Sequence, residues 1–141
     1  MKKILFAADG SENSEKAFLY VKDLAKALVA KVIVLNSYEL PSYYQRYETE
    51  SILSDLESHL VKTSVDLSEN LIKRLADENI EGISITSYGD AGVKIVEEAA
   101  KHNADLIVVG SRGLGGIKSF LLGSVSNYVL HHTDIPVLVI K

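Results

Sequence analysis

The sequence predicts an α/β fold, an open five-stranded parallel sheet with helices on both faces, arranged as a three-layer sandwich. Two observations favour this class. Short apolar runs alternate along the chain with longer segments that carry apolar residues at helical spacing. The resulting order, β-α-β-α-β-α-β-α-β, is typical of parallel strands joined by right-handed crossovers. Since no repeat or shift in composition divides the chain, we expect a single domain over residues 1–141.

The expected strands are apolar runs bounded by turn residues. Most of them are continuous and rich in β-branched residues, as strands buried on both faces are, whereas the third alternates and should be less buried. Pro136 lies near the start of the last run, where its missing N–H does least harm. The predicted strands cover residues 4–8, 31–37, 82–88, 105–109 and 135–140.

Four helices are expected between these strands. The first begins after Ser11 and the third after Asp90, which is a suitable N-cap residue. The second covers about residues 48–79, and Ser64 interrupts its apolar stripe, so a small break or a shift of face is an alternative there. The last covers residues 124–132.

The stretch 38–47 contains Pro41 and four tyrosines, and it is predicted to be a loop. Tyr43 and Tyr44 are interpreted as loop residues that pack in part. A lid over a ligand and a partner surface are the alternatives for these two side chains.

The composition, 47% hydrophobic and 24% charged, is that of a globular domain able to bury a core. The chain has no cysteine, which excludes disulfides and thiolate metal sites. A net charge of −4 makes nucleic acid a poor partner. The apolar run after Lys3 is too short for a signal peptide and no stretch is long enough to span a bilayer, so we expect a cytoplasmic protein without a membrane partner.

A glycine-rich stretch follows the strand predicted at 105–109. Gly110 and Gly113 are followed, after nine further residues, by Gly123 and Ser124, where a helix is expected to begin. Glycine lets the backbone approach a ligand closely, and the N–H groups at a helix start favour negative charge. The stretch therefore predicts an anion site, with a nucleotide phosphate as the ligand. A plain surface turn is the alternative.

This spacing differs from two well-known phosphate-binding motifs. A P-loop needs a lysine after its second glycine, and Gly116 stands at that position here. The dinucleotide fingerprint would need a glycine where Lys118 stands, and it would follow the first strand instead of the fourth. Neither motif describes this chain.

Asp9, Gly10 and Ser11 follow the first predicted strand. In open α/β sheets, ligands lie outside the carboxyl ends of the strands, at the point where the strand order reverses. If the first and fourth strands are neighbours, this turn and the glycine stretch border one crevice. Asp9 would then accept hydrogen bonds from ribose hydroxyls or hold a Mg²⁺ ion that bridges to phosphate. The alternative is that Asp9 shapes the turn or caps the first helix.

On these residues the chain resembles the universal stress protein family, UspA-like and of the ATP-binding type. The spacing of Gly110, Gly113, Gly123 and Ser124 is similar to that family's nucleotide-binding signature, Gly-x2-Gly-x9-Gly-Ser/Thr. The resemblance covers the whole chain and departs mainly in the tyrosine-rich stretch. It implies an adenine-nucleotide alpha-hydrolase-like, Rossmann-like form of the predicted fold.

The resemblance implies ATP as the ligand, with Mg²⁺ as an optional companion held through Asp9. Adenine and ribose would lie between Asp9 and Ser37, and the phosphates against the glycine stretch. It also implies a homodimer in which Val137 to Ile140 pair with their copy, and such pairing would cover an apolar sheet edge. The candidate ligand-binding residues are Asp9, Gly10, Ser11, Ser37, Gly110, Arg112, Gly113, Gly115, Gly116, Gly123, Ser124, Val125 and Ser126.

The leading hypothesis is a small cytoplasmic stress-response protein that binds ATP and acts through nucleotide-dependent conformation or partner binding. No residue is assigned a catalytic role, because no histidine lies beside a serine and an acid in the predicted loops. His131 and His132 are expected to cap or complete the last helix. A slow ATPase and a nucleotide-free dimerisation module of the same fold are the alternatives.

Overall fold

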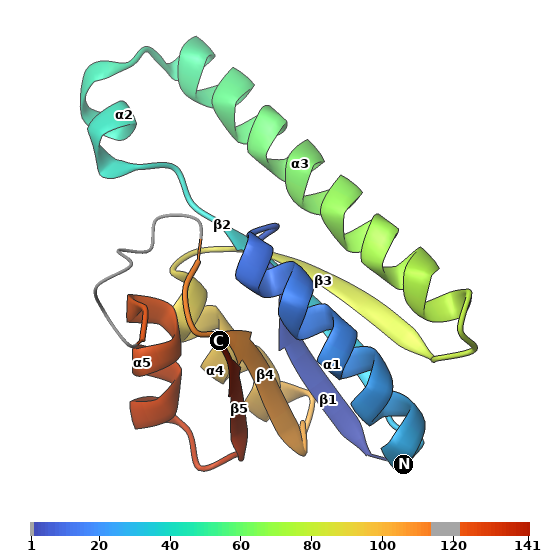
Figure 1. Ribbon diagram of the computed structural model, residues 1–141. Coiled ribbons are helices and arrows are strands. Elements are labelled where there is room, and N and C mark those ends of the chain that lie inside the picture. Colours follow the sequence, from blue (N-terminus) through green and yellow to red (C-terminus); the bar gives the residue numbers. More distant parts are fainter. Residues whose placement is uncertain (1, 114–121) are drawn as a thin grey trace.

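The computed structural model describes residues 2–113 and 122–141 and contains one five-stranded sheet (Figure 1). All strand pairs are parallel, in the order β3-β2-β1-β4-β5. This confirms the predicted sheet. The strands are β1 (Lys3–Ala7), β2 (Lys31–Tyr38), β3 (Gly82–Tyr88), β4 (Leu106–Gly110) and β5 (Val137–Ile140).

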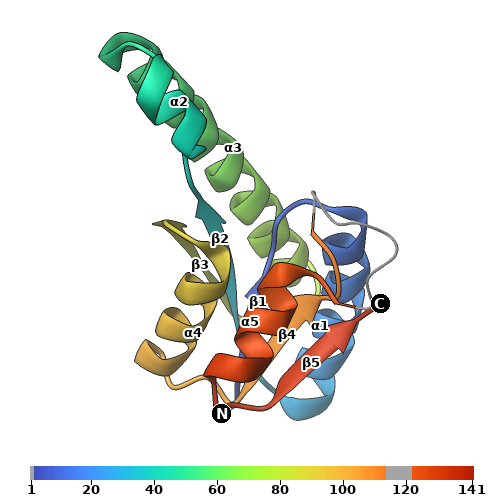
Figure 2. The same cartoon turned by 90° about the vertical axis from the view of Figure 1, so that its left-hand side faces the viewer.

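Helices cover both faces of the sheet, as predicted (Figure 2). On one face, Phe18 of α1 and Leu75 of α3 are fully buried against β1 and β2. On the other, Ile95 of α4 and Val129 of α5 pack over Leu5 and its neighbours. The helices are α1 (Glu12–Leu28), α2 (Ser42–Tyr47), α3 (Glu50–Ala76), α4 (Ala91–Lys101) and α5 (Ser124–His132).

Polar caps explain where three of the helices begin. The side chains of Ser11, Thr49 and Asp90 each accept a hydrogen bond from a backbone N–H three residues further on, at 3.1, 3.4 and 3.1 Å. The Asp90 cap was predicted and is confirmed. Each bond satisfies a donor that the first turn of a helix leaves without an intrahelical partner.

The prediction of a loop over residues 38–47 is wrong in part, because residues 42–47 form α2. Its N-cap is Pro41, whose fixed φ suits the start of a helix. This signal was given less weight than the four tyrosines when the stretch was predicted to be a loop. The break considered at Ser64 does not occur either. α3 runs through it without interruption, and the small Ser64 side chain is buried against the body of the protein.

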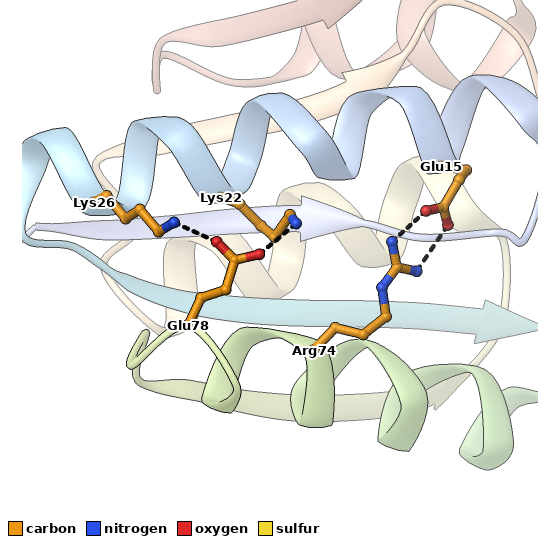
Figure 3. A network of polar contacts seen from close by, with 5 residues as sticks. All are labelled: Glu15, Lys22, Lys26, Arg74 and Glu78. Atoms are coloured by element: carbon orange, nitrogen blue, oxygen red, sulfur yellow. Dashed lines mark hydrogen bonds and ion pairs between the residues drawn. The ribbon is translucent and has the colours of Figure 1, made fainter.

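The C-terminal end of α3 is tied to α1 by charged side chains (Figure 3). Glu78 lies between Lys22, at 2.5 Å, and Lys26, while Arg74 pairs with both carboxylate oxygens of Glu15. Hydrogen bonds from Lys22 and Lys26 lower the pKa of Glu78 to about 2. The Arg74 guanidinium also lies 4.5 Å from the centre of the Phe18 ring, a cation–π contact.

Among the helices in the described ranges, none combines the length and the apolar composition that crossing a bilayer requires.

Candidate functional site

A cavity of about 570 Å³ opens at the carboxyl ends of β1, β2 and β4. β1 lies between β2 and β4, so the strand order reverses here, where ligands bind in open α/β sheets. The pairing of β1 with β4 confirms that the two predicted polar turns border one crevice. The cavity's size is typical of small-molecule sites.

Most of the predicted site residues line this cavity. Gly10 is exposed and does not line it; its φ of +78° instead makes the turn after β1. Gly115 and Gly116 lie outside the described residues. The predicted residues that the cavity brings together are Asp9, Ser11, Ser37, Gly110, Arg112, Gly113, Gly123, Ser124, Val125 and Ser126.

Asp9 shapes the turn after β1, which is one of the alternatives considered for it. Its Oδ1 accepts a hydrogen bond from the Ser11 N–H at 2.9 Å, which shapes the turn. Its Oδ2 faces the glycine loop, which we define as residues 110–124. A Cβ added at Gly113 would lie only 2.6 Å from that oxygen, so a side chain there would displace Asp9 or the loop. One carboxylate oxygen thus holds the turn, and the other lies at the glycine loop.

The other two glycines of the signature are also tightly surrounded. A Cβ at Gly110 would lie 3.2 Å from Cβ of Asn13, and one at Gly123 would lie 3.1 Å from the carbonyl oxygen of Ser111. Both distances are shorter than ordinary van der Waals contact. The spacing of these glycines therefore records places where the backbone of the loop touches its surroundings.

Ser111 joins both described ends of the glycine loop to the rest of the fold, a role that sequence reasoning missed. Its N–H donates to the carbonyl of Ile140 at 2.7 Å, and its own carbonyl accepts from the Gly123 N–H and, at 3.2 Å, from the Ser126 hydroxyl. Its hydroxyl accepts from the Asn13 side-chain amide at 3.1 Å. Ser111 is 2% exposed, so these bonds are shielded from water.

A signal for Ser111 existed in the sequence, since a small polar residue directly after a buried strand has its backbone groups at a sheet end. Asn13 had no such signal. It lies in the first turn of α1, and only the tertiary fold brings it to the loop.

Donors and positive charge face this cavity. α5 begins at the cavity wall with Gly123 as its N-cap, and no side chain of residues 2–113 or 122–141 caps its first turn. Such a helix start favours an anion. The half-buried Arg112 also lines the cavity, and its Nε is buried without a hydrogen-bond partner among the described residues. Together with the apolar wall of Ala7, Leu35, Ile95 and Val109, this arrangement suits a ligand with one anionic and one flat apolar part.

Nothing in the cavity's described lining resembles hydrolytic machinery. No histidine lines it, and the described residues contain no group of three or more His, Cys, Asp or Glu side chains that could hold a metal ion. His131 and His132 lie in the last turn of α5, as predicted, and each Nδ1 is 2.7 Å from a carbonyl oxygen four residues earlier in the same helix.

The comparison with protein families decides the relationship. The model of the universal stress protein family matches residues 1–141. The chain belongs to the universal stress protein family. The resemblance noted from the glycine spacing is thus confirmed over the full length.

Individual relatives support the same assignment. The stress response protein NhaX of Bacillus subtilis is 32% identical over 161 residues, an alignment that covers 99% of this chain and 97% of NhaX. The solved structure of MJ0577, a universal stress protein of Methanocaldococcus jannaschii, superposes with a TM-score of 0.90 at 31% identity, covering 99% of this chain and 95% of that one. It has the fold described above.

A third solved structure is a universal stress protein in complex with cAMP. It superposes with a TM-score of 0.70 at 25% identity and covers 99% of this chain and 96% of that one. At least one structural neighbour in this family therefore binds an adenine nucleotide.

Proposed function

We propose that this protein binds ATP in the cavity at the ends of β1, β2 and β4. The observation that carries the proposal is the glycine loop itself. Gly110, Gly113 and Gly123 have the spacing of the family's nucleotide-binding signature, and all three lie where a side chain has too little room. A loop that only turned the chain would not need three such close approaches.

The residues around the cavity fit the parts of ATP. The backbone N–H groups of the glycine loop, the Ser124 hydroxyl and the uncapped start of α5 would hold the phosphates. Arg112 would offset their charge. The ribose would be held near Asp9, and the apolar wall beside Ser37 would receive the adenine. The cAMP complex of a relative supports an adenine nucleotide over other anions.

Mg²⁺ would enter this site with ATP and not by itself. Asp9 is the one carboxylate in the cavity's described lining, and Mg²⁺ typically combines one or two carboxylates with substrate phosphates and water. The ion would supply charge neutralisation of the phosphates. We therefore expect Mg²⁺ to strengthen nucleotide binding through Asp9 only when ATP is present.

We further propose that binding serves regulation and not fast turnover. The lining offers donors for an anion but no general base beside a positioned nucleophile. The protein would act in the cytoplasm, where ATP is abundant, through a conformation or a partner that depends on the nucleotide. A homodimer through β5 is part of the proposal, since β5 is an edge strand whose residues Val137 to Val139 are half-buried.

Isothermal titration calorimetry with ATP tests the binding. Wild-type protein should bind ATP, and Gly113→Val should weaken binding at least ~100-fold, about 2.7 kcal/mol, because its side chain would occupy the space beside Asp9. Ala100→Val, on the exposed side of α4, is the matched control and should bind like the wild type. Equal affinity of Gly113→Val and the wild type would show that the phosphates bind elsewhere.

A further inference from the structure

One end of the molecule extends beyond the sheet, and only Leu40 of its residues is buried in the described chain. We define the arm as residues 39–57, which include α2 and the first turns of α3. Figure 1 and Figure 2 both show this end of the two helices away from the sheet. No residue of α2 is buried, and the buried residues of α3 begin only at Ser64.

The arm carries large apolar side chains on its surface. Tyr43, Tyr47 and Ile52 are 63%, 69% and 44% exposed, and Tyr44 is 39% exposed. The Tyr43 ring lies 5.8 Å from that of Tyr44 and 4.9 Å from that of Tyr47, measured between ring centres. Four exposed large apolar residues within ten positions make a patch, and such patches mark interaction sites more often than isolated exposed residues do. Tyrosine is also enriched among residues that dominate binding energy.

The arm also carries the net charge of the protein. It has five acidic residues and one basic residue, Arg46, which gives −4; the whole chain is also −4, so all other residues together are neutral. None of the six forms an ion pair within the part of the chain that the structure describes. Five of them are exposed and Glu48 is half-buried. The acidic residues are Glu39, Glu48, Glu50, Asp55 and Glu57.

We propose that the arm is a docking surface for a basic, amphipathic segment of another protein. Such a segment would lay its apolar side on the tyrosines and Ile52 and its lysines or arginines against the acidic residues, as an amphipathic helix does on an apolar surface of opposite charge. A second copy of this chain is disfavoured as the occupant, because two arms of charge −4 would repel each other. The proposal is independent of ATP binding, since no arm residue lines the nucleotide cavity.

A synthetic amphipathic helical peptide of leucine and lysine, about 14 residues long, serves as the probe for the full chain. Its binding is measured by fluorescence anisotropy at low and physiological salt. The wild type should bind the peptide, and a matched leucine–glutamate peptide should not bind. Affinity should fall several-fold with added salt, because exposed charges are screened.

Two arm variants separate charge from apolar contact. The variant with Glu48→Gln, Glu50→Gln, Asp55→Asn and Glu57→Gln should lose at least ~10-fold in affinity and most of the salt dependence. Tyr43→Ser with Tyr47→Ser should lose about 10-fold while keeping the salt dependence. The control is Leu19→Ser with Tyr20→Ser, which changes two side chains on α1 that are 49% and 53% exposed and should leave binding unchanged.

Three results would overturn the proposal. The first is binding that neither arm variant weakens, and the second is equal binding of the leucine–glutamate peptide. The third is a wild-type oligomer, seen by analytical ultracentrifugation, that Tyr43→Ser with Tyr47→Ser dissociates, because the arm would then contact a second copy. Circular dichroism of each variant confirms that α3 is retained, so a loss of binding cannot be attributed to unfolding.

Discussion

The glycine loop and the arm both begin at the carboxyl end of a strand, β4 and β2 respectively, yet the fold constrains them very differently. In the glycine loop the backbone lies so close to Asp9, Asn13 and Ser111 that a Cβ has too little room at three positions. In the arm most side chains are exposed, Leu40 is the one buried residue, and no residue of α2 is buried. Close packing therefore restricts which residues fit in the glycine loop, whereas packing places little restriction on the residues of the arm.

The largest expected difference is in the loss of stability caused by truncating a leucine in the packed part of α3 or in its part within the arm. Leu75 is fully buried, whereas Leu56 in the arm is only half-buried. Leu75→Ala should lower the free energy of unfolding by about 2–5 kcal/mol, because it leaves a cavity in the core. Leu56→Ala should cost less than about 1 kcal/mol. Urea denaturation measures both, and similar losses would show that the arm packs against something in solution.

The next effect concerns the glycine loop. At Gly123 the atoms nearest an added Cβ belong to the backbone of Ser111 and Arg112, at 3.1 and 3.4 Å, and backbone cannot rotate away. Gly123→Ala should therefore weaken ATP binding by about 10-fold or more, about 1.4 kcal/mol. Ser51→Ala on the exposed face of α3 is the control in the arm. If the two variants bind ATP equally well in calorimetry, the loop is less constrained than its contacts indicate.

A smaller effect is expected at the side-chain amide of Asn13, which donates a hydrogen bond to the hydroxyl of Ser111. Asn13→Ala should reduce ATP affinity by about 3- to 10-fold, as expected for one shielded hydrogen bond. Asn13→Asp, which keeps the shape and can accept a hydrogen bond from the Ser111 hydroxyl, should retain more of the affinity. Measuring the apparent Kd together with the Tm in the absence of nucleotide separates positioning of the loop from folding. The Kd should rise, whereas the Tm should stay close to that of the wild type.

The smallest effect is a pH dependence at the packed end of α3. Lys22 and Lys26 lower the pKa of Glu78 to about 2, below its ordinary value of 4.5. The stabilisation is therefore fully present above about pH 4.5 and is lost as the pH falls towards 2. Glu78→Gln should flatten the acid limb of stability against pH within this window. An unchanged acid limb would show that the pair does not persist in solution, as is common for exposed ion pairs.

The sequence predicted the parts of the fold that periodicity and spacing determine. Apolar runs placed all the strands to within two residues at either end, because strand residues make contacts throughout the core. Glycine spacing located the glycine loop, because its glycines stand where the backbone makes close contacts. α2 was missed because it buries no side chain and so leaves no apolar period. The Ser64 break was wrong because Ser64 is itself buried within the uninterrupted α3, so a polar residue in the apolar stripe did not mark a change of face.

Two features depended on tertiary structure, one at the candidate site and one in the arm. The hydrogen bond from Asn13 to Ser111 joins residues 98 positions apart, and no local sequence pattern predicts such a contact. The balance of charge between the arm and the rest of the chain could be counted from the sequence, but it became informative only once the arm was seen to stand apart (Figure 2).

The most direct test of the proposed function is to denature the purified protein and chromatograph what it releases. ATP in near-stoichiometric amount, absent from the Gly113→Val variant, is the predicted result. ADP with steady phosphate release in solution would identify a slow ATPase instead of a regulatory binder. If no nucleotide is released and the wild type binds no added ATP, the glycines serve only as turns and the proposal of an ATP site is contradicted.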